Sequence, residues 1–251
     1  MQSLYTLEIA CFSLAGMQVA IANGAHRIEL CENPAEGGTT PSYGTLVMAR
    51  QLAGTIPVFP IIRPRGGHFY YDKQEVAAML QDVMLCKKLG FEGVVLGALH
   101  NNGTVDVATT RRLVEAAYPM EVTFHRAFDR TPVLQEALEA VIQCGCQRIL
   151  TSGGLPTAPQ AASQIAALVQ QAHGRIIMMP GSGVKSSNVA NLAAITGAVE
   201  FHTAARTQSS LIGIYNPKAM EEQPSFTTVD AQEVQNLRKQ LKHYFEGVAQ
   251  Q

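Results

Sequence analysis

Short apolar runs alternate with longer stretches of helical periodicity along nearly the whole chain. The runs have the length of buried parallel strands, and the stretches between them have the length of helices. We expect strands at residues 7–11, 27–31, 58–62, 93–96, 122–124, 148–151, 176–179 and 199–202. We expect helices near residues 13–23, 41–53, 73–89, 106–117, 132–144, 158–172, 186–196 and 230–245.

Glycines follow several of the expected helices, a few residues before the next strand. Gly24, Gly90, Gly145 and Gly197 are each suited to a left-handed C-cap. Eight such strand–helix units in about 250 residues predict an α/β fold, a single-domain (β/α)8 TIM barrel over residues 1–251. An open doubly wound sheet is the alternative, but no G-x-G-x-x-G follows the first expected strand.

Residues 207–229 form the one long stretch without a pattern, between the last expected strand and the last helix. In a barrel, such a loop lies over the C-terminal face, where it can act as a lid. An insertion without a role explains the stretch equally well.

Composition narrows the class of protein. The 251 residues are 47% hydrophobic, and a chain of this length buries about 70% of its surface in one core. With 19 Lys and Arg against 20 Asp and Glu, no basic excess exists for nucleic-acid binding. No apolar run is long enough for a membrane span, and the N-terminus lacks the basic region of a secretory signal.

The five cysteines are an odd number at irregular spacings. A chain with a large core needs no disulfides, so we expect reduced thiols and a cytoplasmic location. Cys144 and Cys146 flank a predicted C-cap glycine, Gly145, and are interpreted as structural.

Charged and polar side chains occur at strand ends, where burial of an unpaired charge is costly. These residues are Glu8, Glu29, Arg63, Arg65, His125 and His202. Since strand C-termini converge at the mouth of a barrel, we expect one acid–base cluster there, with Arg63 and Arg65 facing the same side. The alternative is a lattice of ion pairs that fills the barrel without chemistry.

Small residues follow the last two expected strands. Gly181 and Gly183 open the seventh loop, and Thr203 lies close to Arg206 after the eighth strand. In barrels these loops often bind phosphate through backbone N–H groups and a helix N-terminus. We therefore expect an anion site at these four residues, although tight turns also use glycine.

Cys11 and Cys31 each end a strand, and these two strands are expected to be neighbours. A pair of thiolates can hold a soft ion such as Cu(I). Glu29 and Cys31 share a face of their strand whereas Glu8 and Cys11 do not, so the two thiols meet only if the first strand leaves its register. The alternative is that both are small buried apolar residues.

The chain up to its final helix resembles the CutC family of copper homeostasis proteins. The matching segments are residues 7–11 (LEIAC), 27–31 (RIELC), 36–42 (EGGTTPS), 61–67 (IIRPRGG), 122–129 (VTFHRAFD), 149–153 (ILTSG), 181–184 (GSGV) and 200–202 (EFH). The resemblance implies a TIM barrel and a cytoplasmic role in Cu(I) binding or copper trafficking. It places the cysteines that close the first two strands at Cys11 and Cys31.

Two functions follow. The first is copper homeostasis, with Cu(I) bound by Cys11 and Cys31 and a contribution to copper tolerance or trafficking. The second is an enzyme that acts on a small anionic or phosphorylated metabolite, in which the last two loops hold the anion and the arginines orient an oxyanion. His125, with Glu8 or Glu29, would then move a proton. The expected partner is a copper ion or a small anion, and a homo-oligomer is compatible with the sequence.

Overall fold

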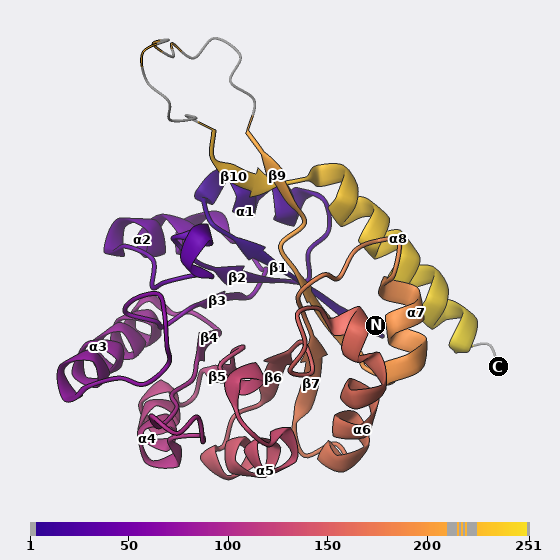
Figure 1. The fold of residues 1–251 in the computed structure, drawn as a ribbon. Coiled ribbons are helices and arrows are strands. Elements are labelled where there is room, and N and C mark those ends of the chain that lie inside the picture. Colours follow the sequence, from indigo (N-terminus) through magenta and orange to yellow (C-terminus); the bar gives the residue numbers. More distant parts are fainter. Residues whose placement is uncertain (1–3, 210–214, 216, 218, 220–224, 250–251) are drawn as a thin grey trace.

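The computed structural model describes residues 4–209, 215, 217, 219 and 225–249. Eight parallel strands form a ring that is surrounded by helices (Figure 1). The barrel strands are β1 Thr6–Cys11, β2 Arg27–Leu30, β3 Val58–Pro60, β4 Gly93–Leu96, β5 Glu121–Phe124, β6 Arg148–Thr151, β7 Ile177–Pro180 and β8 Glu200–Thr203. The helices are α1 Leu14–Ala22, α2 Tyr43–Leu52, α3 Lys73–Leu89, α4 Val107–Ala117, α5 Leu134–Cys144, α6 Ala162–Ala172, α7 Val189–Thr196 and α8 Ala231–Val248.

The strands pair in the order of a closed barrel. One half has the order β3-β2-β1-β8 and the other β4-β5-β6-β7. A parallel bridge between Ile61 and Val95 joins β3 to β4, and β7 packs beside β8 at the other seam. The predicted (β/α)8 TIM barrel is therefore confirmed, and each expected element lies within a few residues of an observed one.

Alternation along β1 separates the two layers of the fold. Leu7, Ile9 and Cys11 point outward and belong to the large apolar core between strands and helices. Glu8 points into the barrel, where it is completely buried. The outer layer therefore supplies the apolar core, and the inner layer is free to carry polar groups.

The inside of the barrel is charged where most barrels are filled by branched apolar residues. Arg27, Arg148 and Glu200 lie there, each less than a tenth exposed, and they form ion pairs with one another. The ring of Phe59 lies under both arginines, 5.2 Å from each guanidinium carbon. This charged layer lies beneath the mouth of the barrel and is connected to it by the ion pair between Arg27 and Glu8.

Residues 207–229 begin and end in a short hairpin that the sequence pattern does not predict. Strand β9, Arg206–Gln208, pairs antiparallel with β10, Thr227–Val229, and the hairpin stem contacts α1. Most of the predicted lid lies outside the described residues. None of the described helices is both long and apolar enough to cross a membrane.

Candidate functional site at the barrel mouth

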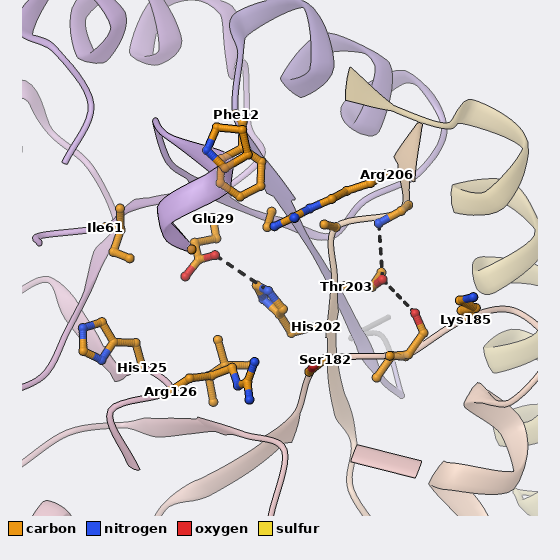
Figure 2. A pocket seen from close by; sticks show the side chains of 18 of the residues that line it. Phe12, Glu29, Ile61, His125, Arg126, Ser182, Lys185, His202, Thr203 and Arg206 are labelled. Carbon is orange, nitrogen blue, oxygen red and sulfur yellow. Dashed lines mark hydrogen bonds and ion pairs between the residues drawn. The ribbon is translucent and has the colours of Figure 1, made fainter. Parts of the chain in front are cut away.

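A cavity of about 800 Å³ opens at the C-terminal ends of the strands (Figure 2). Its walls come from the strand ends and from the loops that follow β1, β2, β3, β5, β7 and β8. The lining includes Phe12, Glu29, Ile61, Arg63, His125, Arg126, Lys185, His202, Thr203 and Arg206. Four of the six residues predicted for the acid–base cluster therefore line one cavity, namely Glu29, Arg63, His125 and His202.

His202 lies between two carboxylates. Its Nδ1 is 2.7 Å from Oε1 of Glu8, which is buried beneath the cavity floor. Its Nε2 is 3.7 Å from Oε2 of Glu29, which lines the cavity (Figure 2). The imidazole of His202 thus lies between Glu8, which is inside the barrel, and Glu29, which lines the cavity.

Glu8 is fixed as an anion. Burial opposes its charge, but the ion pair with Arg27 and the bond from His202 lower the pKa of Glu8 well below its usual range. Burial likewise opposes the charge of His202, yet the carboxylates of Glu29 and Glu8 outweigh it and raise the pKa of His202. The imidazole therefore holds its second proton more firmly than a free histidine does.

Glu29 has the opposite environment. Burial raises its pKa, and the negative charge of Glu8 adds to this against the lowering effects of His202 and Arg206. His202 is its one ion-pair partner among the described residues. A carboxyl group with a raised pKa can exchange a proton with a neighbouring imidazole.

His125 lies at the cavity wall as a neutral ring. Its Nδ1 accepts a hydrogen bond from the N–H of Ala127 at 3.3 Å, so the ring proton is assigned to Nε2. Nε2 is buried and has no hydrogen-bond partner among the described residues. Burial and the nearby charge of Arg63 lower the pKa of His125 to about 3, which makes it a hydrogen-bond donor rather than a cation.

Arg63 and Arg65 do not act together. The Arg63 guanidinium donates to the carbonyls of Glu36, Gly38 and Gly67 and stacks on Phe69, so it ties two loops to the cavity wall. Arg65 lies outside the cavity lining and pairs with Glu75 of α3. The expectation that the two face one side is wrong, because β3 ends at Pro60 and strand alternation does not extend to these positions.

The four predicted anion-site residues have different roles in the structure. The N–H of Gly181 donates to the carbonyl of Thr151, and a Cβ there would lie 2.4 Å from Leu150, so this glycine serves packing. The Thr203 hydroxyl donates to the carbonyl of Val184 at 2.8 Å. Neither group has a free donor for an anion. Gly183 and Arg206 both line the cavity.

Free donors do gather beside those two residues. The N–H groups of Gly183, Val184 and Ser187 have no acceptor among the described residues, and all three residues line the cavity. Lys185 and Arg206 also line it and form no ion pair within the described part of the chain. The Arg206 guanidinium lies over the ring of Phe12, at 4.8 Å. Two cations and three residues whose N–H groups lack an acceptor in the described structure thus line the same cavity, which suits an anion.

A second carboxylate limits that space. Glu233 of α8 accepts from the N–H of Ser186 at 2.7 Å and from its hydroxyl at 2.8 Å. The N–H and hydroxyl of Ser186, which lies just before α7, are therefore already bonded to the Glu233 side chain and are not available to an external anion. An external anion would be held by Gly183, Val184 and Ser187 with the two cations.

The two candidate copper ligands are adjacent in the backbone but lie on opposite faces of the sheet. The N–H of Cys31 donates to the carbonyl of Cys11 at 2.9 Å, and β1 keeps its register up to Cys11. Cys11 packs in the outer apolar core, whereas Cys31 packs inside the barrel with Phe59 and Ile61. Burial, followed by the charge of Glu29, raises the pKa of both thiols. As packed, this pair does not present two thiolates to one ion.

Sequence reasoning missed the charged layer below the cavity. Arg27 and Arg148 begin β2 and β6, and Glu121 pairs with Arg148 from the edge of the barrel. The signal was available, because Arg27 has the same strand parity as Glu29 and Glu200 the same as His202. The ion-pair lattice considered as an alternative therefore exists, beneath the cavity and continuous with it.

Comparison with known proteins identifies the family. The sequence profile of the CutC family matches residues 5–207, which include all eight barrel strands. The chain belongs to the CutC family. A CutC family protein of Chromobacterium violaceum is 53% identical over 202 residues, 80% of this chain and 81% of its own length. A CutC family protein of Parabacteroides distasonis is 45% identical over 238 residues, 95% of this chain and 98% of its own.

A solved CutC structure agrees with the fold. The crystal structure of CutC from Streptococcus agalactiae, whose name gives copper homeostasis as a provisional role, is 32% identical with a TM-score of 0.76. The match covers 80% of this chain and 98% of that one. The link to copper homeostasis comes from the name of this CutC relative. The described residues contain no group of three or more metal-ligating side chains.

Proposed function

We propose that the barrel mouth of this CutC protein binds a small, phosphate-bearing metabolite and moves a proton on it. The observation that carries the proposal is the position of His202 between Glu8 and Glu29, on the floor of a cavity that is also lined by Lys185 and Arg206, two cations without an ion pair among the described residues. A purely structural lattice has no need of two cations, Lys185 and Arg206, that form no ion pair within the part of the chain that the structure describes. Nor does it need a carboxylate such as Glu29 facing open space.

Each residue of the site has a distinct task in this proposal. Lys185 and Arg206, with the N–H groups of the seventh loop, hold the anionic group. Glu8 orients the imidazole of His202 through Nδ1 and keeps it basic. His202 and Glu29 then share one exchangeable proton at the cavity surface, which is the arrangement that general acid–base catalysis requires.

Anion binding is tested by calorimetry with inorganic phosphate and a panel of small phosphorylated metabolites. We expect the double substitution Lys185→Gln with Arg206→Gln to weaken binding at least tenfold. The matched control is Lys242→Gln, which removes a cation from the exposed face of α8. No heat with any ligand, or equal loss in the control, contradicts the proposal.

Proton transfer is tested separately, in deuterated water. Incubation with the metabolites that bind should exchange a carbon-bound hydrogen for deuterium, which mass spectrometry detects. His202→Asn should abolish the exchange while leaving the metabolites bound, because the cations of the anion site remain. Binding without exchange for every ligand would leave a binding protein rather than an enzyme.

Copper binding through Cys11 and Cys31, in a protein of the cytoplasm, is the second proposal. In its favour, the two cysteines are hydrogen-bonded neighbours, and all five cysteines are free thiols. Against it, the thiols are buried on opposite faces of the sheet and hold their protons strongly. Cu(I) could reach both only after the Cys11 side chain leaves the outer core.

A further inference from the structure

We propose that the ligand of this cavity has two polar ends, with its phosphate at the loops after β7 and β8 and a carboxylate or carbonyl oxygen at His125. The inference rests on the proposed function, because it takes the anion site at Lys185 and Arg206 as the first end. It adds a second subsite on another wall of the same cavity. The ligand class is therefore a small phosphorylated carboxylic acid or phosphorylated carbonyl compound.

The two ends are separated by the acid–base pair. Figure 2 shows His125 on one side of the cavity and Lys185 with Thr203 on the other, with Glu29 and His202 between them. A ligand that reaches both sides passes over that pair. The carbon atoms between its two polar groups would then lie next to the groups that exchange protons.

The donor at the second end is an unsatisfied N–H. His125 is 3% exposed, and the ring edge with Nδ1 faces Ala127 and Gly97, where a Cβ would lie 2.8 Å from Nδ1. Nε2–H has no acceptor in the described structure and is itself enclosed by protein atoms, so a ligand oxygen reaches it only when the ring turns toward the cavity that His125 lines. A buried donor without a partner costs stability, so such a group in a native site calls for an acceptor from outside.

Charge at this wall favours an oxygen that is negative or becomes so. Arg63 is buried beside His125 and bonds to backbone carbonyls, so no carboxylate of the described chain neutralises it. Arg126 also lines the cavity, but Asp129 holds its guanidinium at 2.8 Å. The uncompensated cation at this end is therefore Arg63, and the free donor next to it is His125.

Matched ligands measure the second subsite. Methyl phosphate carries one polar end, and 2-phosphoglycolate and 3-phosphoglycerate add a carboxylate at increasing distance from the phosphate. We expect the wild-type protein to bind at least one of the two carboxylates tenfold or more tightly than methyl phosphate in calorimetry. His125→Phe, which keeps a ring against Phe69 but removes Nε2–H, should abolish that preference and leave methyl phosphate binding within about twofold.

Lys185→Gln separates the two ends. It should weaken all three ligands by a similar factor, since each carries the phosphate. Equal wild-type affinity for all three ligands, or an unchanged preference in His125→Phe, overturns the two-ended ligand while the anion site stands. Absence of binding by all three in the wild-type protein overturns the anion site and this inference together.

Discussion

Arg27 and Arg148 share one oxygen of Glu200 inside the barrel. Nη2 of Arg27 and Nε of Arg148 both donate to Oε2, at 2.5 and 3.1 Å. Arg27 also pairs with Glu8, and Glu8 bonds to His202. A continuous series of ion pairs therefore runs from the interior of the barrel to the floor of the cavity.

Glu200→Gln should lower the free energy of unfolding by about 3–5 kcal/mol, because it leaves two buried arginines short of one negative charge. Urea unfolding followed by circular dichroism measures the change. Glu139→Gln is the control, since it breaks an exposed ion pair with Arg175 and should have little effect. Equal effects of the two substitutions would show that the shared oxygen is unimportant for stability.

Acidification should destabilise the protein partly through His125. Its pKa is lowered to about 3 in the folded state, while an unfolded histidine titrates near 6.5. Between these values the unfolded chain binds the extra proton, so stability rises with pH by up to about 1.4 kcal/mol per unit. In His125→Phe this part of the slope should vanish.

The measurement is the urea midpoint at several pH values from 4 to 7. The corresponding substitution at the exposed His100 serves as the control. If His125→Phe follows the wild-type pH dependence, the ring is not held neutral in the folded protein.

Gly181→Ala should destabilise the protein by about 1–3 kcal/mol. The added Cβ would lie 2.4 Å from Leu150 and 3.2 Å from the ring of His202, so it should also disturb the acid–base pair. Gly44→Ala is the matched control, because no atom lies within 4 Å of its Cβ position in α2. Thermal unfolding of the two variants gives the comparison, and a tolerated Gly181→Ala would mean that the loop yields easily.

For the copper proposal, competition with a Cu(I) chelator under reducing conditions is decisive. Replacing both Cys11 and Cys31 by Ser should remove Cu(I) binding, whereas replacing Cys144 and Cys146 should leave it intact. The softness of the thiolate favours Cu(I) over Mg²⁺ or Ca²⁺, which prefer oxygen ligands. Unchanged affinity in the first double variant would rule out this pair as the copper ligands.

Periodicity predicted the barrel well because each strand and helix buries a complete apolar face. The expected strand at 148–151 and the expected helix at 73–89 coincide with β6 and α3. The hairpin of β9 and β10 was not predicted because its strands have three residues each, all three residues of β9 are exposed, and β10 buries only Val229. Strands that bury no apolar face leave no alternation to detect.

The site was predictable only where the backbone was regular. Glu8, Glu29 and His202 lie within strands, so their parity placed them correctly on the inner face. Arg65 lies in a loop beyond β3, where its direction depends on its contact with Glu75 of the following helix α3 and not on strand alternation. The N–H groups of the loop after β7 that lack an acceptor among the described residues belong to the backbone, so the types of the side chains do not indicate them.

The shared charges inside this barrel constrain how the protein can change. Removal of any one charge among Arg27, Arg148 and Glu200 leaves a buried partner with one ion pair fewer, although a complete apolar set of similar volume could be neutral or stabilising. A lineage that acquires substitutions one at a time would have to pass through an unstable intermediate to reach that set. Redesign of the barrel interior should therefore exchange these residues together and retain Glu8 only with a new cation beside it.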